Sequence, residues 1–297
     1  MELRVLRYFL AVVREESISK AAESLHLTQP TLSRQIMELE EELGIRLLNR
    51  GKKNRKVTLT DEGRLFRKRA EELVELADKM RLEFSLTEGP VSGDIYIGGG
   101  ETEAMSLIAR TATELQKEYP HIRYHLFSGN AADVTERLDN GLLDFGILVG
   151  EADMTKYDYL PLPVTDVWGV LMRKDSPLAG KNAVSQKDLS EIPLILSQQS
   201  LSSNELSGWY GGAFSESNVV ATYNLIYNAA LMVASGFGYA VTLDKLVNTT
   251  GNSDLCFRPL APRLEARLSI VWKKHRGFSK ATELFLQKLR CLIHPDD

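Results

Sequence analysis

Polar side chains that could bind nucleic acid gather in two short stretches near the N-terminus. Residues 28–35 include Gln29, Thr31, Ser33, Arg34 and Gln35. Residues 50–56 form a basic run that includes Arg50, Lys52, Lys53 and Arg55. Arginine and glutamine can each form two hydrogen bonds with one base edge, whereas lysine and arginine neutralise phosphates. The two stretches therefore indicate a DNA-binding surface, although a solvated helix face and a solvated loop are the alternatives.

Three helices must position the first stretch. Apolar residues at helical spacing predict a helix from Leu3 onward, and Ser17 is a good N-cap for a second short helix. Thr28 is a good N-cap for a third helix, with Pro30 in its first turn and Gly44 after its last. Two short helices joined by a tight turn are typical of a helix-turn-helix, in which the second helix enters the major groove of DNA.

A β-hairpin wing is predicted beside the third helix, because the basic run lies between two apolar segments, 47–48 and 57–59. The distribution of charge agrees with this interpretation. Residues 1–60 hold eleven Lys and Arg against eight Asp and Glu, whereas residues 89–297 hold nineteen against twenty-four. The formal net charge of −4 therefore conceals a basic N-terminal part, and it does not exclude DNA as a partner.

Several motifs in this part follow one another in a fixed order. They are Ala21-Ala22 through Leu25, the run Thr28-Gln29-Pro30-Thr31-Leu32-Ser33-Arg34-Gln35-Ile36, Leu39-Glu40, Leu43-Gly44, Leu47-Leu48-Asn49-Arg50 and Leu59-Thr60-Asp61-Glu62-Gly63. In this order they resemble the signature of the LysR-type transcriptional regulators. Two departures are Leu48, where the family often has Phe, and a slightly longer wing.

The resemblance implies roles for single residues. Contacts with the groove and the phosphates are implied for Gln29, Pro30, Thr31, Ser33 and Arg34, and contacts with the DNA backbone for Arg50 and the wing cations. We expect residues 1–60 to form a winged helix-turn-helix that is all α except for the small β wing.

A long linker helix is expected over residues 61–88. Apolar residues recur in it at spacings of four and three, which is typical of a coiled-coil seam. The predicted seam consists of Phe66, Ala70, Leu73, Ala77, Met80 and Phe84. We interpret this helix as the dimerisation element, as the resemblance implies, because a dimer presents two recognition helices to a partly palindromic site. The alternative is a helix that packs on its own domain.

The remaining residues, 89–297, are expected to form an α/β domain. Strands are predicted at 95–97, 122–127, 145–149, 167–172, 194–196, 219–222, 239–242 and 268–272, several of them followed by helices. This alternation predicts a parallel sheet. By order and spacing the domain resembles the two-lobed periplasmic binding proteins, with lobe one at about 91–163 and 267–297 and lobe two at about 164–266.

Three polar loops at the carboxyl ends of strands are expected to bind a small-molecule effector between these lobes. The candidate residues are Gly99, Gly100, Glu101, Thr102, Ser128, Gly129, Ser197, Gln198 and Ser200. Among them we expect Thr102 to be a direct ligand contact. Glu101, with Glu103, is expected to favour the start of the following helix from the solvent side.

Catalytic patterns are missing from the sequence. The glycines at 98–100 precede no Gly-Lys-Ser/Thr, no Gly-x-Ser-x-Gly occurs, and His121 and His125 fall on a predicted strand rather than at helical metal-binding spacing. We therefore expect no enzyme activity, no metal and no cofactor. Both cysteines, Cys256 and Cys291, are expected to be small buried hydrophobes.

The sequence thus predicts a cytoplasmic transcriptional regulator, since it contains neither a membrane-length apolar segment nor a secretory signal. Its expected partners are double-stranded DNA with a partly palindromic site, an effector, further copies of itself in a dimer or tetramer, and RNA polymerase. Two alternatives remain: an architectural DNA-binding protein without an effector, and a metabolic α/β enzyme with a fused DNA-binding head.

Overall fold

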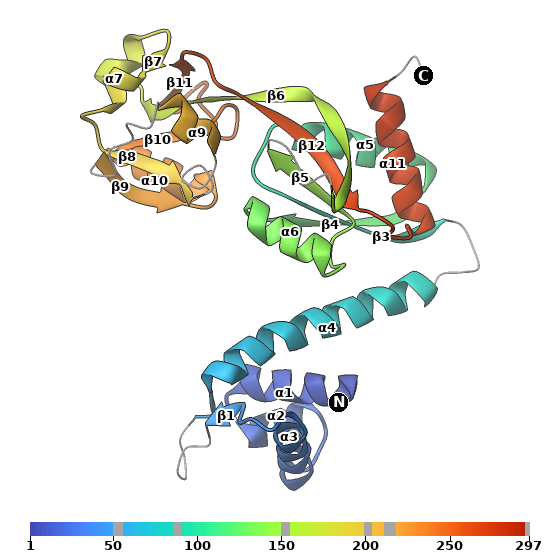
Figure 1. The fold of residues 1–297 in the computed structure, drawn as a ribbon. Helices are drawn as coiled ribbons and strands as arrows, with labels where there is room; N and C mark the ends of the chain where they lie inside the picture. Colours follow the sequence, from blue (N-terminus) through green and yellow to red (C-terminus); the bar gives the residue numbers. More distant parts are fainter. Residues whose placement is uncertain (50–55, 86–90, 150–154, 199–203, 211–217, 295–297) are drawn as a thin grey trace. The chain divides into compact units, whose positions relative to one another are not determined.

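Two separately packed units, Met1–Thr87 and Glu88–Asp297, make up the chain (Figure 1). The structure is a computed structural model that describes residues 1–49, 56–85, 91–149, 155–198, 204–210 and 218–294. None of the helices in these ranges is long and apolar enough to cross a membrane.

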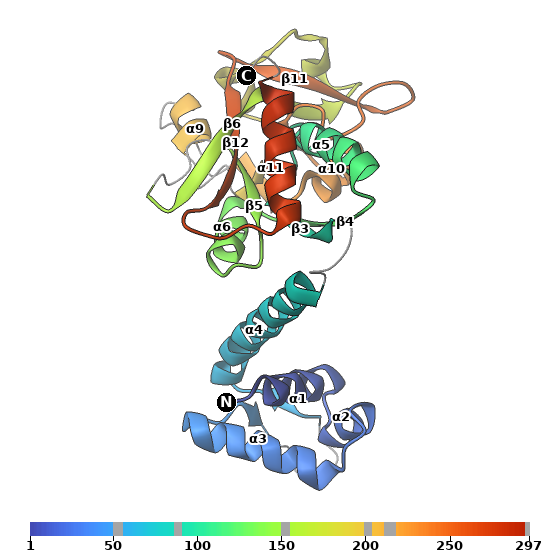
Figure 2. The ribbon, with the colours of Figure 1, turned by 90° about the vertical axis from the view of Figure 1, so that its right-hand side faces the viewer.

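The first unit is a bundle of helices with a two-stranded sheet. Its elements are α1 (Leu3–Glu15), α2 (Ile18–Ser24), α3 (Gln29–Leu43), β1 (Leu48–Asn49), β2 (Thr58–Leu59) and α4 (Asp61–Ser85). Figure 2 shows α1, α2 and α3 packed together. Antiparallel pairing of Leu48 with Leu59 joins the two strands at the base of the wing. These are the elements of the predicted winged helix-turn-helix.

The ends of α2 and α3 form where the sequence predicts them. The Ser17 side chain accepts a hydrogen bond from the Lys20 amide at 3.4 Å, and the Thr28 side chain accepts one from the Thr31 amide at 3.4 Å. Gly44 follows α3 with a φ of +68°, a left-handed conformation that costs glycine little. Buried apolar residues such as Phe9 and Leu32 then fill the core between the helices.

The second unit begins with a three-layer lobe. Its parallel strands are β3 (Ser92–Gly99), β4 (His121–Ser128) and β5 (Phe145–Val149), and its helices are α5 (Met105–Glu118), α6 (Ala131–Asp139) and α11 (Lys280–Ile293). Figure 2 shows α5 and α11 side by side. Ile147 of β5 packs in the core beneath these two helices, whereas Leu148 packs in a second core with α6. The alternation of a strand thus fills both faces of the sheet.

Two long strands continue into a second lobe (Figure 1). These are β6 (Tyr157–Arg173) and β12 (Glu265–Lys273), which pair antiparallel as far as Val167 and Glu265. From Trp168 onward β6 pairs instead with β10 (Tyr239–Leu243), and from Gly169 also with β11 (Leu255–Ala261). The strand β6 therefore belongs to the sheets of both lobes.

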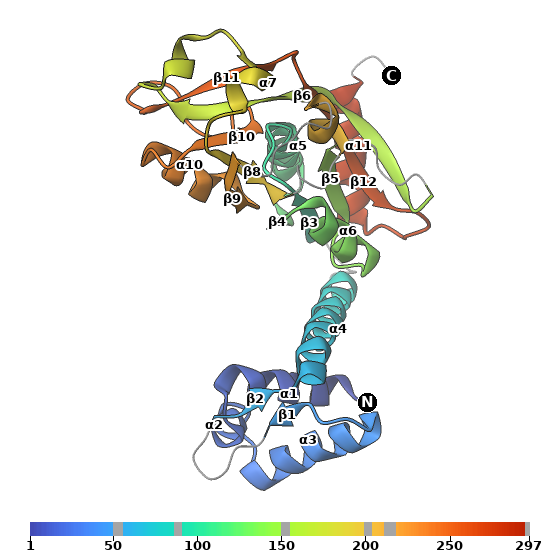
Figure 3. The same ribbon diagram turned by 60° about the vertical axis from the view of Figure 1, so that its left-hand side comes forward.

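The second lobe has a core of its own. Parallel strands β10, β8 (Leu194–Ser197) and β9 (Val219–Tyr223) form its sheet. Figure 3 shows α10 (Ile226–Ala234) beside these strands. Shorter elements complete the lobe, namely the 3-10 helix η1 (Pro177–Gly180), β7 (Val184–Ser185), α7 (Gln186–Leu189) and α9 (Asn204–Trp209).

Two expectations about this unit are wrong. The sheets are mixed rather than parallel, because β6 and β12 return between the lobes and pair antiparallel with their neighbours. Cys256 is buried as expected, but Cys291 is exposed. Cys291 lies in the last turn of α11, on the side of the helix that faces away from the core residues Phe285 and Leu289.

An ion-pair cluster joins β3 to the edge strand β4. Asp94 is 8% exposed, and its carboxylate accepts a hydrogen bond from Arg123 Nη2 at 2.9 Å and lies 2.7 Å from His125 Nε2. Burial acts to raise the pKa of Asp94, but the hydrogen bonds and the charge interactions with Arg123 and His125 act against it, and the net effect is a lowered pKa. The ring of Tyr96 stacks on His125 with centroids 4.5 Å apart.

Replacing Asp94 by asparagine should destabilise the second unit in a pH-dependent way. A carboxylate whose pKa is lowered by folding stabilises the folded state above its unfolded pKa of about 3.9, and that contribution is lost as the pH falls through the folded value. We expect Asp94→Asn to lower the free energy of unfolding by about 1–3 kcal/mol at pH 7. Urea unfolding of both proteins from pH 7 to pH 3 measures this difference. A gap that stays constant with pH would show that the carboxylate charge is not responsible.

Candidate nucleic-acid interface and ligand site

The N-terminal end of α3 presents the predicted DNA-binding residues. Gln29, Pro30 and Thr31 are exposed, and Ser33 and Gln35 are half-buried. The Thr28 and Thr31 hydroxyls lie 2.7 Å apart. Because Leu32 and Ile36 are fully buried in the core, the orientation of the helix and of this polar end is fixed.

One carboxylate holds two of these residues. Arg34 Nε donates to Glu38 Oε1 at 2.8 Å, and Gln35 Nε2 donates to Glu38 Oε2 at 2.7 Å. The Arg34 side chain is nevertheless 80% exposed. An exposed pair at this spacing on a helix contributes only about 0.3–0.5 kcal/mol. Glu38 therefore orients the Arg34 guanidinium and the Gln35 amide. Both groups can leave Glu38 for another acceptor with little loss of free energy.

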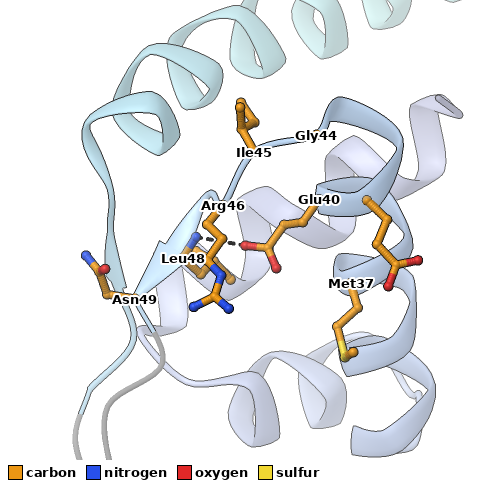
Figure 4. A pocket seen from close by; sticks show the side chains of 8 residues that line it. Met37, Glu40, Gly44, Ile45, Arg46, Leu48 and Asn49 are labelled. Carbon is orange, nitrogen blue, oxygen red and sulfur yellow. Dashed lines mark hydrogen bonds between the residues drawn. The ribbon is translucent and has the colours of Figure 1, made fainter.

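The wing is fixed to α3 by a residue for which the sequence predicted no role. The Glu40 carboxylate accepts hydrogen bonds from the backbone amides of Leu47 at 2.8 Å and Leu48 at 3.0 Å. Figure 4 shows the bond between Glu40 and Leu48. It thereby positions β1 relative to the recognition helix. The contact spans seven and eight residues and passes through a turn, so no helical or strand periodicity could have identified it.

Four predicted wing contacts, Arg50, Lys52, Lys53 and Arg55, lie outside the described residues. Beside them, Lys56 forms an ion pair with Glu16 just after α1. The Val57 amide donates to the Glu16 carbonyl at 2.9 Å. Both contacts attach the returning arm of the wing to the end of α1.

A hollow in the surface of this unit lies at the other end of α3 (Figure 4). Its lining residues are Met37, Glu40, Glu41, Gly44, Ile45, Arg46, Leu48 and Asn49. None of them belongs to the predicted DNA or effector sites.

The structure divides the predicted seam of α4 between two environments. Ala70 is buried in the core of its own unit, and Phe66 packs there against Phe9 with ring centroids 5.1 Å apart. These two side chains are therefore used within the chain, which corrects their predicted placement on a free seam. Leu73 and Met80 are 44% and 54% exposed. Ala77 is half-buried, and the side chain of Phe84 lies outside the described ones.

The helix instead exposes an apolar face composed of four residues. These are Leu65, Leu73, Leu76 and Met80. The Arg7–Asp78 ion pair, at 2.5 Å, attaches α4 to α1 on another side. The predicted seam included residues of the core-facing side because α4 has two apolar faces. The spacing of apolar residues alone does not distinguish these faces.

Two of the three predicted effector loops lie next to each other. In the parallel register of β3 and β4, Gly99 is opposite Ser128, and the Gly129 amide donates to the Gly99 carbonyl at 3.1 Å. Ser128 is exposed and Gly129 is buried. A Cβ atom added at Gly100 would meet only the Gly129 carbonyl within 4 Å, at an ordinary contact distance of 3.7 Å.

Thr102 lies in a buried hydrogen-bonded position. It is 7% exposed, its hydroxyl donates to Asp166 Oδ2 at 2.5 Å, and it accepts from the Ala104 amide at 3.1 Å. Burial raises the pKa of Asp166. These two bonds anchor the loop to β6, and the predicted ligand contact of Thr102 stays a prediction.

Glu101 contacts a different helix from the expected one. Its carboxylate accepts a hydrogen bond from the backbone amide of Ile226, the first residue of α10. The expectation that it stabilises the start of the following helix, α5, is wrong. The partners are 125 residues apart in sequence.

The third loop lies at the end of β8 in the second lobe. Ser197 is half-buried and Gln198 is exposed there, and Ser200 lies outside the described residues. All three loops thus follow the carboxyl ends of parallel strands, as the sequence predicts.

Models of two protein families match the chain. The LysR substrate binding domain matches residues 88–292, and the bacterial regulatory helix-turn-helix protein, lysR family, matches residues 3–64. The chain belongs to the LysR family of transcriptional regulators. It is a DNA-binding transcriptional regulator with an effector-binding domain and not an enzyme, as predicted from the sequence.

Individual relatives agree with this assignment. The chain is 31% identical over 201 residues to the HTH-type transcriptional regulator BsdA of Bacillus subtilis (strain 168), covering 66% of this chain and 67% of that protein. The crystal structure of CbnR, a LysR family transcriptional regulator, superposes with a TM-score of 0.78 at 20% identity over 99% of both chains. Full-length CbnR complexed with its target DNA has a TM-score of 0.75 at 21% identity, covering 98% and 99%. These structural likenesses confirm the predicted fold class.

Proposed function

We propose that this regulator binds a partly palindromic double-stranded DNA site as a homo-oligomer in the cytoplasm, and that an effector bound between the lobes alters its action on RNA polymerase. The observation that carries the DNA-binding part is the exposed polar end of α3, with the Arg34 guanidinium free to exchange from Glu38 to a base. CbnR, whose fold the chain shares, is a regulator solved with its target DNA.

The residues of α3 and the wing divide the recognition of DNA between them. Arg34 and Gln35 read base edges. The arginine carries two donors that can bind one base edge, and the glutamine carries a donor and an acceptor. Contacts with the groove or the phosphates come from Gln29, Pro30, Thr31 and Ser33. The wing cations Arg50, Lys52, Lys53 and Arg55 bind the backbone and supply affinity without sequence preference.

Dimerisation uses the exposed apolar face of α4. Leu73 and Met80 of the predicted seam belong to this face, and Leu65 and Leu76 extend it. A second copy of α4 could cover these side chains and bring two recognition helices to related half-sites. The exposure of four large apolar side chains on one helix supports this assignment.

The effector site is formed by the loops at residues 99–102, 128–129 and 197–200. Pairing of Gly99 with Ser128 supports the proximity of the first two loops. Backbone amides and hydroxyls, which these loops contain, are the kinds of group that fix the orientation of a small polar molecule in a binding site. A ligand that contacts both lobes would bind one relative placement of the lobes more tightly than another. An effector can shift the placement only through such a difference in affinity.

A bulky residue at Gly100 tests the effector site. Gly100→Trp should abolish the thermal shift that an active compound from a metabolite panel gives with the wild type, because the indole would fill the space between the first two loops. A Cβ atom at Gly100 makes only an ordinary contact, so the backbone should tolerate a side chain there. We expect DNA affinity and oligomeric state to stay unchanged, because the loop belongs to neither the DNA-binding unit nor α4. The matched control is Gly180→Trp, at an exposed glycine where an added Cβ atom meets nothing within 4 Å.

An unaltered ligand response in Gly100→Trp would place the effector elsewhere. If no compound shifts the wild type, the architectural DNA-binding alternative gains support.

A further inference from the structure

Helix α10 lacks a cap from its own sequence. Its N-cap residue is Leu225, which has no polar side chain and makes no capping hydrogen bond. The first amides of any helix have no partner within the helix, and a carboxylate placed there satisfies them and interacts favourably with the helix dipole. The Leu225 amide itself is bound by Asn224 Oδ1 at 2.9 Å. The amide of Ile226 must therefore find its acceptor outside the helix.

The missing acceptor comes from the other lobe. Glu101 lies in the loop after β3 of lobe one, and its carboxylate accepts the hydrogen bond of the Ile226 amide in lobe two. Tyr223 of β9 gives a second sign of this proximity. Burial raises the pKa of Tyr223, and the negative charge of Glu101 acts in the same direction. The side chain of Glu101 thus reaches the start of α10 and the end of β9 together.

The loop that carries Glu101 is itself fixed to the strand that joins the lobes. The neighbouring residue, Thr102, donates to Asp166 of β6 at 2.5 Å. Asp166 is 3% exposed and lies where β6 leaves its pairing with β12 for its pairing with β10. Two adjacent residues therefore attach one loop to β6 and to lobe two. A movement of lobe two about this part of β6 would stretch the bond between Glu101 and Ile226.

We propose that Glu101 is an inter-lobe latch, a positioning residue whose bond to the start of α10 sets the relative placement of the two lobes. The inference deepens the proposed function, because the placement of the lobes is the quantity that an effector would shift. A compound that binds the loop at residues 99–102 acts on the loop that also carries this bond. The latch therefore sets the relative placement of the lobes in the absence of the effector, which is the placement that the effector has to change.

Two variants at Glu101 and one control test the latch in the whole 297-residue chain, without DNA or any added compound. Glu101→Ala removes the acceptor, and Glu101→Gln keeps an oxygen but removes the charge. The control is Glu103→Gln, which removes a neighbouring charge from the same loop. Hydrogen exchange of residues 226–229 should accelerate roughly two- to thirtyfold in Glu101→Ala, as for the loss of a helix cap. We expect a smaller acceleration in Glu101→Gln and none in the control.

A distance measurement separates a latch from a simple cap. Spin labels at Ala132→Cys in lobe one and Lys187→Cys in lobe two, with Cys291→Ser, report the lobe separation when labelled chains are diluted with unlabelled ones. Both replaced positions are exposed. The latch predicts a longer or broader distance distribution in Glu101→Ala than in Glu103→Gln.

Two results would overturn the inference. Unchanged exchange at residues 226–229 would exclude the bond, and faster exchange with unchanged distances would reduce Glu101 to a helix cap. Neither result depends on an effector, so failure of the latch is distinguishable from failure of the effector site, which Gly100→Trp tests.

Discussion

Replacing Arg34 by alanine is expected to weaken binding to the specific DNA site by about 1–3 kcal/mol, or roughly five- to 150-fold. The guanidinium is 80% exposed at the N-terminal part of α3, and it can donate two hydrogen bonds to one guanine. Its bond to Glu38 is too weak to compete with this interaction. Affinity for random DNA should fall much less. Titrations with specific and with random DNA at one salt concentration measure the ratio of the two affinities.

Neutralising the wing supplies the contrast for this prediction. Changing Lys52 and Lys53 to alanine should weaken specific and random DNA alike. It should also flatten the salt dependence by about one unit for each lost phosphate contact. If the wing variant lost sequence preference as strongly as Arg34→Ala, the division between base reading and backbone binding would be incorrect.

Replacing Leu73 by glutamate is the second change with a large expected effect. Leu73 lies on the exposed apolar face of α4, and a charge buried there without a partner in a dimer costs several kcal/mol. We expect the variant to sediment as a monomer at concentrations where the wild type is oligomeric. Affinity for a two-half-site DNA should fall with it, because a monomer presents only one recognition helix.

The matched control for Leu73→Glu is Arg67→Glu. Arg67 is an exposed residue on another face of α4, paired with Glu71. The Arg67→Glu variant should sediment as the wild type does. A Leu73→Glu variant with wild-type mass and DNA affinity would mean that the exposed face is not the dimer interface.

Local features were predictable from the sequence. Ser17 and Thr28 cap their helices as expected, since capping depends on residues within one turn. The strand at 145–149 has the predicted bounds, because it is a short apolar run with clear ends. The family was recognised from the closely spaced motifs around α3, and the fold class followed from the resemblance to that family.

Contacts over long sequence distances could not be predicted. Glu101 caps a helix 125 residues away, and no property of its neighbours indicates that partner. The hydrogen bond between Thr102 and the buried Asp166 of β6 joins residues 64 positions apart, and the sequence did not indicate it. Phe66 was assigned to the seam by its spacing, although its ring packs on Phe9. Each of these features depends on tertiary contacts that local patterns do not encode.

The central claim is that α3 reads a DNA sequence and that Arg34 is a principal reader. Selection of DNA fragments from a random pool by the wild type and by Arg34→Ala, side by side, tests it most directly. We predict that the wild type enriches one partly palindromic motif, and that the variant enriches the same motif with relaxed preference at one position in each half-site. An identical motif from both proteins, or no motif from the wild type, would contradict the claim.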